Sequence, residues 1–123
     1  MIPACTEKAP AAIGPYSQAI AAGSLVFTSG QLPVSPETGE TACGGISGQA
    51  RQSCENVRAV LEAVGSSMDR VLKTTCFLTD MGDFAAFNEV YASFFTGRPA
   101  RSCVAVRQLP KGVLCEIEAI AEI

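Results

Sequence analysis

Two charged residues near the C-terminus of the chain lie in segments that otherwise look fit for burial. Arg101 opens the apolar, strand-forming run Arg101–Val106, directly after Pro99 and Ala100. A guanidinium is costly to bury without a partner, and its planar fork fits a planar anion such as a carboxylate. The same position also suits a surface ion pair at a strand end, because most arginines stay near the protein surface.

The second residue, Glu116, stands between Cys115 and Ile117. Desolvation raises the pKa of a half-buried carboxyl group unless a cation lies opposite it. Arg101, on the preceding strand, could be that cation, and the two residues would then form an ion pair between strands. Alternatively, Arg101 binds the carboxylate of a small acid and Glu116 handles a proton. These two residues alone leave both interpretations open.

The chain has no histidine, which excludes serine–histidine and cysteine–histidine nucleophile pairs and any histidine-ligated metal site. Acid–base chemistry must then come from a carboxylate, a tyrosine, a lysine, a thiol or ordered water. The six cysteines form no CxxC pair, and we expect them to be free thiols in a reducing compartment. Cys54, Cys76, Cys103 and Cys115 fall in apolar patterns typical of small core residues, although one of them could be a nucleophile.

The length and charge of the chain limit its class. With 123 residues, of which 48% are hydrophobic, we expect a single globular domain over residues 1–123. A net charge of -3 argues against a nucleic-acid partner. No apolar run is long enough to span a bilayer, and Met1–Lys8 lacks the features of a signal peptide, so we expect a cytoplasmic protein without a membrane partner.

The segments that position Arg101 and Glu116 alternate between strand and helix patterns in the order β-β-α-β-α-β-β. The expected strands are Ser17–Ala22, Leu25–Ser29, Val71–Leu78, Arg101–Val106 and Val113–Ile123. Gln49–Val64 has the apolar spacing of a helix, with Ser47 as the expected N-cap and Gly65 just past its C-terminus.

A second helix is expected after Asp83, the expected N-cap by residue type, and it should stop before Pro99. Its buried stripe is interpreted as core packing and consists of Phe84, Phe87, Tyr91 and Phe94. Right-handed crossovers place both helices on one face of the sheet.

The other face of the sheet also needs a cover. Ser102–Val106 is nearly apolar on both sides, and a strand of that kind is normally buried on both faces. Two helices cover one face only, so the pattern indicates that another copy of the chain covers part of the second. Oligomerisation is therefore a hypothesis from the pattern.

Several short pieces of the sequence, each weak alone, form a set whose order and spacing are highly specific. The pieces are Ala11–Ala19, Phe27–Gln31, Gln49–Ser53 with Asn56 and Val57, Lys73–Thr75, Asp83 and Phe84 with Asn88, Pro99–Val104, and Leu109–Lys111 with Glu116–Ala121. Through these pieces the sequence resembles the Rid (YjgF) family of imine and enamine deaminases nearly from end to end.

This resemblance implies a chorismate-mutase-like α+β fold, a mixed sheet with two helices on one face, assembled as a homotrimer with active sites between subunits. It implies hydrolysis of reactive 2-imino acids, such as 2-iminobutanoate and 2-iminopropanoate, to 2-keto acids and ammonia, with no cofactor and no metal. By the same resemblance, Arg101 binds the substrate carboxylate, and Glu116 with the backbone carbonyl of Cys103 orients the attacking water. Tyr16, Ser29, Gly30 and Asn88 match positions that line the pocket.

The chemistry agrees with these roles, because an imine is already electrophilic and water needs placement more than activation. Two departures from the family pattern stand out. The link Thr96–Pro99 is short, with Arg98 where an aromatic residue often precedes the proline, and Cys115 replaces an aliphatic residue. The first departure bears on the cleft rim and on substrate preference.

Two other function classes are weighed against the deaminase. A ribonuclease or translation inhibitor is disfavoured by the net charge of -3 and the absence of histidine. A binding or chaperone-like module could use the same cleft for small carboxylic acids without turnover. Arg101 fits either activity, whereas Glu116 favours turnover.

Overall fold

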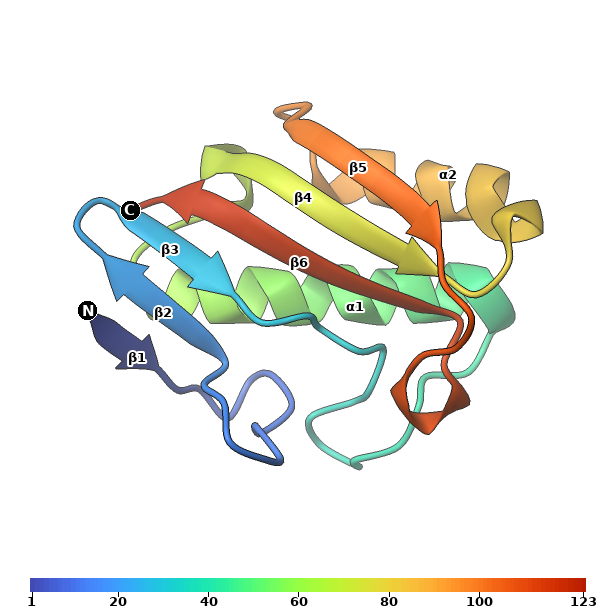
Figure 1. Cartoon of the computed structure of the whole chain (residues 1–123), viewed down its shortest axis with the longest axis horizontal. Coiled ribbons are helices and arrows are strands. Elements are labelled where there is room, and N and C mark those ends of the chain that lie inside the picture. The colour runs from blue at the N-terminus through green and yellow to red at the C-terminus, as the bar shows by residue number, and fades with distance from the viewer.

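The structure, a computed structural model, describes residues 1–123 as one sheet backed by a layer of helices (Figure 1). Short 3-10 turns precede the fourth strand, the second helix and the last strand. The strands and helices are β1 (Ile2–Ala4), β2 (Ala19–Ala22), β3 (Leu25–Thr28), α1 (Gly45–Ala63), β4 (Val71–Leu78), α2 (Phe84–Phe94), β5 (Ala100–Ala105) and β6 (Cys115–Glu122).

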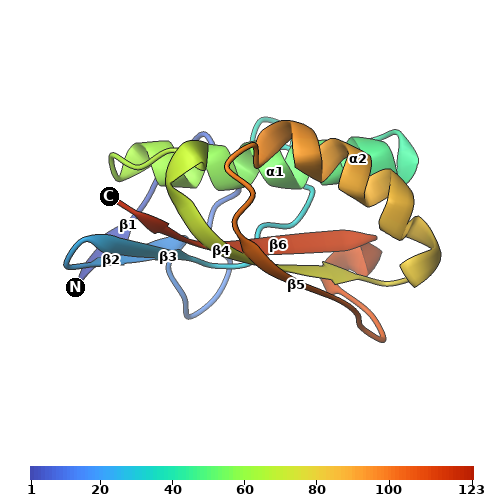
Figure 2. The ribbon, with the colours of Figure 1, turned by 90° about the horizontal axis from the view of Figure 1, so that it is seen from above.

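The six strands form one mixed sheet in the order β1-β2-β3-β6-β4-β5. Every neighbouring pair is antiparallel except β4 and β5, which are parallel and are joined through α2. Figure 2 shows α1 and α2 side by side on one face of this sheet, with the other face open. The predicted α+β arrangement, with both helices on one face, is confirmed.

Helix α1 packs its apolar stripe on the sheet as predicted, with Ala50, Cys54, Val57 and Leu61 fully buried. Its C-terminus also follows the prediction. Gly65 has a φ of 84° and donates its N–H to the carbonyl of Glu62, while the next N–H bonds the carbonyl of Leu61.

The start of α1 was mispredicted. The helix begins at Gly45, and the residue that caps it is Gly44, which has a φ of 99°. Ser47 lies inside the first turn and is not the N-cap. Two consecutive glycines with positive φ let the chain enter the helix earlier than its apolar pattern begins.

Helix α2 begins after Asp83 as predicted, but the Asp83 side chain makes no capping bond. The carboxylate of Asp80 instead accepts the N–H of Gly82 and caps the short turn that leads into the helix. The buried side of α2 carries Phe87, Val90 and Tyr91, and Phe95 just after the helix is also buried. Phe84 and Phe94, which were expected in the stripe, are only half-buried.

One feature of the sheet differs from the sequence prediction: the short edge strand β1 was not predicted, because Ile2–Ala4 is too brief to show an alternating pattern. The strand β5 forms the other edge of the sheet, and Ser102 and Val104 are exposed in the single chain. That another copy of the chain covers this side stays a prediction. Nothing within one chain covers this edge.

The core lies between the helices and the sheet and holds 19 buried residues, among them Cys54, Cys76 and Cys115. All six cysteines are free thiols. Burial raises the pKa of Cys76 to about 12 and that of Cys115 to about 11, so both stay protonated. Neither helix is long and apolar enough to cross a membrane.

Candidate active site

Arg101 is held by helix α2 and has no carboxylate partner. Its Nη1 donates a hydrogen bond of 2.6 Å to the Oδ1 of Asn88. Its guanidinium carbon lies 4.7 Å from the ring centre of Tyr91 and 5.5 Å from that of Phe84. Stacking and one hydrogen bond fix the plane of the guanidinium and leave its other N–H groups available to an anion.

Tyr91 is itself anchored, because its hydroxyl lies 2.6 Å from the Oγ1 of Thr74 in strand β4. This contact fixes the position of the Tyr91 ring beneath Arg101. Sequence analysis assigned Tyr91 and Phe84 only to core packing. Their spacing from Asn88 on one helix, three residues after it and four before it, is the signal that could have placed all three on one side of α2.

Glu116 occupies the open face of the sheet, next to Gly30. A Cβ atom on Gly30 would overlap the Glu116 carboxylate, so glycine at this position leaves room for the carboxylate where it lies. Burial raises the pKa of Glu116, and the nearby charge of Glu118 adds to the shift. No cation offsets this, since the one ion pair in the chain joins Arg58 and Glu55. Glu116 therefore holds a proton more readily than an ordinary glutamate.

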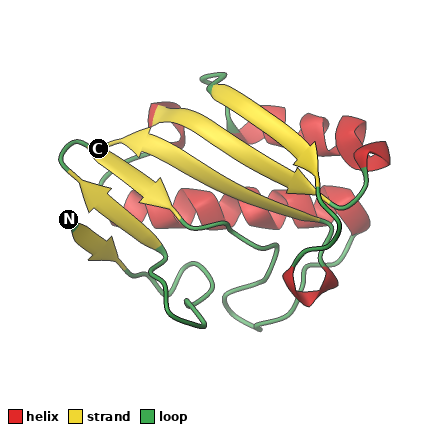
Figure 3. Cartoon of the chain, in the orientation of Figure 1, coloured by secondary structure: helices red, strands yellow, loops and turns green.

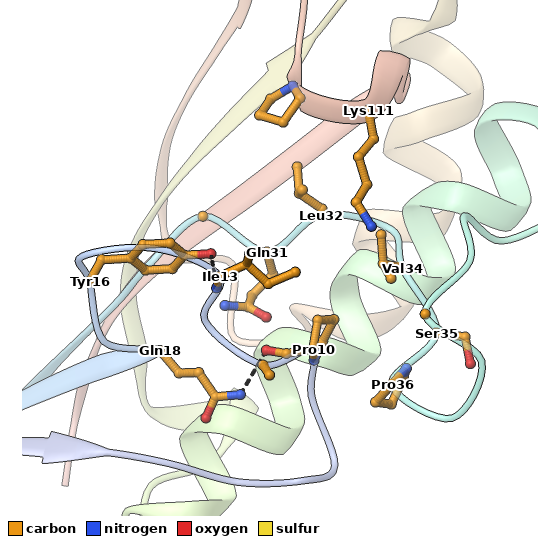
Figure 4. Close-up of a pocket in the computed structure, with 14 residues that line it drawn as sticks. Pro10, Ile13, Tyr16, Gln18, Gln31, Leu32, Val34, Ser35, Pro36 and Lys111 are labelled. Carbon is orange, nitrogen blue, oxygen red and sulfur yellow. Dashed lines mark hydrogen bonds between the residues drawn. The ribbon is translucent and has the colours of Figure 1, made fainter.

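Tyr16 and Gly30 both line one hollow, which has a volume of about 580 Å³. Its lining residues come from the segments before β2, after β3 and before β6, which Figure 3 draws mostly as loops and turns. In Figure 4 the hydroxyl of Tyr16 accepts the N–H of Ile13, and the side chain of Gln18 donates to the carbonyl of Pro10.

Ser29, next to Gly30 in the chain, and Lys111, which lines the hollow, belong to the same region. Ser29 directs its hydroxyl to the carbonyl of Ser17, which ties two loops together rather than presenting a free group. Lys111 was not among the predicted site residues, and its side chain runs along the wall of the hollow near Val34 (Figure 4).

Cys103 turns its side chain to the helix side of the sheet, because it pairs with the buried Cys76 and parallel neighbours share a face. Burial raises the pKa of its thiol. The backbone of Val106 faces β4, because its N–H donates to the carbonyl of Leu78. Successive residues of a strand direct their backbone groups to opposite sides, so the carbonyl of Cys103, three residues earlier, points away from β4 and out of the sheet edge. That carbonyl is free to accept a bond from water.

The prediction that Arg101 and Glu116 lie close together on neighbouring strands is wrong within one chain. Strand β4 lies between β5 and β6, with Arg101 beside Thr74 and Glu116 beside Phe77. The side chain of Arg101 faces α2, whereas that of Glu116 faces the open side. The interpretation as an ion pair between adjacent strands is excluded by this topology.

The predicted site residues thus form two groups. Asn88 and Arg101 line a second hollow, of about 530 Å³, between α2 and the start of β5. Tyr16, Gly30 and Glu116 lie at the loop end of the open face. No cluster of three or more cysteine or carboxylate side chains is placed to hold a metal ion.

Comparison with known proteins gives these groups a context. The model of the family described as endoribonuclease L-PSP matches residues 6–123. The chain belongs to this family. A 2-iminobutanoate/2-iminopropanoate deaminase of Salmonella typhimurium is 56% identical to it over 120 residues, which cover 94% of this chain and 93% of that protein.

Two solved structures agree with the fold. Escherichia coli TdcF with bound serine has a TM-score of 0.96 at 50% identity and covers 100% of this chain and 99% of that chain. The E. coli yjgF gene product has a TM-score of 0.94 at 49% identity and covers 99% of this chain and 98% of its own. The resemblance to Rid (YjgF) proteins and the chorismate-mutase-like fold are thereby confirmed.

Proposed function

We propose that this protein is an enzyme that hydrolyses 2-imino acids, such as 2-iminobutanoate and 2-iminopropanoate, to 2-keto acids and ammonia. The observation that carries the proposal is Arg101, a guanidinium oriented by Asn88 and Tyr91 with no acidic partner in the chain. An arginine fixed in this way is prepared for a carboxylate from outside the chain. The deaminase of S. typhimurium, 56% identical, acts by its name on such acids.

The reaction needs water and a group that moves protons. Water adds to the carbon of the C=N bond, the C–N bond then breaks, and ammonia leaves as the 2-keto acid forms. Glu116 accepts a proton from the attacking water and returns it to the departing nitrogen, a role that suits a carboxyl group whose pKa is raised. The outward carbonyl of Cys103 holds the water, and Arg101 fixes the substrate.

We further propose that the site is completed between copies of the chain. Arg101 and Cys103 lie at the free edge of β5, while Glu116 lies on the open face two strands away. A homotrimer in which the edge of one copy meets the open face of the next would bring these groups together. The exposed Phe27 and Val104 support such contacts, because apolar side chains of this size favour burial.

A coupled assay tests the proposal. An amino-acid oxidase generates the imine, semicarbazide traps it, and an active protein lowers the yield of semicarbazone. Binding of small carboxylic acids without any fall in semicarbazone would contradict the deaminase and favour a binding module. Bound serine in the E. coli TdcF structure is the observation that keeps the binding module under test.

The family description keeps a ribonuclease in view. The chain has 12 acidic and 9 basic residues, so it offers little positive charge to bind RNA. It also has no histidine, so no imidazole is available to catalyse RNA cleavage. Incubation with single-stranded RNA tests it directly: cleavage that Arg101→Ala and Glu116→Gln leave intact would show a second activity outside the imine site.

A further inference from the structure

A second arginine, Arg98, borders the hollow that contains Arg101. Both line the space of about 530 Å³ between α2 and β5, together with Asn88, Tyr91 and Phe95. Arg98 sits in the turn that connects these elements, where its N–H donates to the carbonyl of Phe95 at 3.1 Å. Its φ of 53° is in the left-handed region, so the turn fixes the direction in which its side chain leaves the backbone.

No acidic side chain lines this hollow, and neither arginine has an ion-pair partner in the chain. The nearby Asp69 accepts a hydrogen bond from the hydroxyl of Thr96 rather than contacting Arg98. Arg98 and Arg101 therefore border one mostly apolar hollow that has no acidic residue in its lining. An anionic group that contacts both side chains supplies the missing counter-charge.

We propose that the preferred substrates are 2-imino acids that carry a second carboxylate on the side chain. This inference rests on the proposed deaminase function. Arg101 binds the carboxylate next to the imine, and Arg98 binds the distal one. The Cα atoms of two residues three positions apart are separated by at most about 10 Å, and the long side chains can converge on a four- or five-carbon dicarboxylate.

The chemical step is the same for this substrate class. Water adds to the imine carbon, the C–N bond breaks, and the products are a 2-keto dicarboxylic acid and ammonia. Arg98 takes no part in proton transfer and acts only on affinity and orientation. Its effect should therefore appear as a difference between substrates rather than as a general loss of rate.

The test compares imines made from aspartate or glutamate with imines made from alanine or 2-aminobutyrate in the semicarbazide assay. We expect kcat/KM to be higher for the dicarboxylic imines. Arg98→Asn removes the charge with a residue that tolerates positive φ, and it should lower kcat/KM for dicarboxylic imines about tenfold while changing the others much less. Arg98→Lys should retain part of the preference, since it keeps the charge.

Arg107→Asn is the matched control, because the substitution removes the same charge from an exposed arginine. Arg107 lies past the other end of β5, away from the hollow. The Arg107→Asn variant should leave the substrate preference unchanged. A binding readout accompanies the kinetics: 2-oxoglutarate should raise the Tm more than 2-oxobutyrate, and Arg98→Asn should abolish that difference.

The outcomes separate the two proposals. If no imine is hydrolysed, the proposed function fails, while the Tm comparison still tests whether Arg98 binds a second carboxylate. If imines are hydrolysed but Arg98→Asn and Arg107→Asn change both substrate classes alike, the deaminase stands and the role of Arg98 is overturned.

Discussion

At the level of single residues, Arg101 is defined by what holds it. Asn88 fixes one edge of the guanidinium and Tyr91 one face, so the group is rigid before any ligand arrives. Arg101→Lys should lose at least about tenfold in activity, because an ammonium cannot form two parallel hydrogen bonds to a carboxylate. Arg101→Ala should lose on the order of 3 kcal/mol or more of transition-state binding, measured as kcat/KM in the semicarbazide assay.

The thermal midpoint of the same variants distinguishes a substrate-binding role from a structural one. Arg101 bonds a neutral amide rather than a carboxylate, so its removal leaves no buried charge behind. Both variants should stay folded. An Arg101→Ala protein that still quenches semicarbazone formation at the native rate would overturn the mechanism.

The raised pKa of Glu116 should make both activity and stability depend on pH, with activity favoured by the ionised form and folding by the protonated form. Its pKa is raised above the ordinary value of 4.5, so the acid limb of the kcat/KM profile should lie above the pH at which a free glutamate titrates. Glu116→Gln should abolish that limb and lower the rate about hundredfold or more, since the variant cannot accept a proton.

Stability gives an independent check on the Glu116 carboxylate. A carboxyl group whose pKa is raised in the folded state favours folding below its unfolded pKa, and this contribution is lost as pH rises through the folded pKa. Glu116→Gln should therefore raise the Tm near neutral pH, and the difference from wild type should disappear in acid. A Tm gain that is independent of pH would contradict the assigned shift.

Cys103 should matter through its backbone and not through its thiol. Burial raises the pKa of the thiol, which leaves little nucleophilic thiolate. Cys103→Ser keeps the carbonyl and most of the volume, so activity should stay within about tenfold of wild type. A loss as large as that of Arg101→Ala would show that the thiol takes part in the reaction.

At the level of elements, the loop after β3 passes so close to β6 that it sets the position of Glu116. In Gly30→Ala the new Cβ overlaps the carboxylate, which must swing away because it is the flexible end of its side chain. We expect a small loss of stability, within about 1 kcal/mol, and a loss of activity of about tenfold or more. Adding Gly30→Ala to Glu116→Gln should lower the rate no further, whereas additive effects would show that Gly30 acts elsewhere.

The elements were largely predictable because their patterns are local. The stripe of α1 and its C-terminal Gly65 follow from spacing and residue type. The start of α1 was not, because Gly44 and Gly45 enter a helix through conformations that no apolar pattern reports. The edge strand β1 escaped prediction because three residues carry no periodicity.

The site was less predictable than the elements. Resemblance to a family named Arg101, Glu116 and Asn88, but the order of strands in the sheet is not local information. The intervening β4 therefore separates two residues that sequence order had brought together. The role of Tyr91 beneath Arg101 was also missed, because its pattern is that of a core residue. Tyr91 does both: it packs against Phe95 and it stacks against the guanidinium.

For the whole molecule, the free edge of β5 and the open face of the sheet are complementary features. The edge presents backbone groups such as the Cys103 carbonyl, and the face presents exposed Phe27 next to half-buried Ile120. A trimer should therefore be the species found by sedimentation equilibrium at micromolar concentration. A monomeric mass would contradict both the apolar contact and a site shared between copies.

Mixing two inactive variants tests whether each site draws on two copies. Arg101→Ala and Glu116→Gln each remove one group, so a site built within one chain stays inactive in every mixture. If Arg101 comes from one copy and Glu116 from its neighbour, some sites in mixed trimers receive both intact residues. Random reassembly of equal amounts should then restore about one quarter of the wild-type rate.

The variants are unfolded together and refolded so that their subunits exchange, and the same procedure on each variant alone is the control. The two single-variant samples should stay inactive, while the mixture should gain activity in step with the fraction of mixed trimers. Mixed trimers that form but remain as inactive as their parents would show that Arg101 and Glu116 do not meet across a subunit boundary. In that case the free edge of β5 and the face bearing Glu116 serve separate purposes, and the shared cleft is wrong.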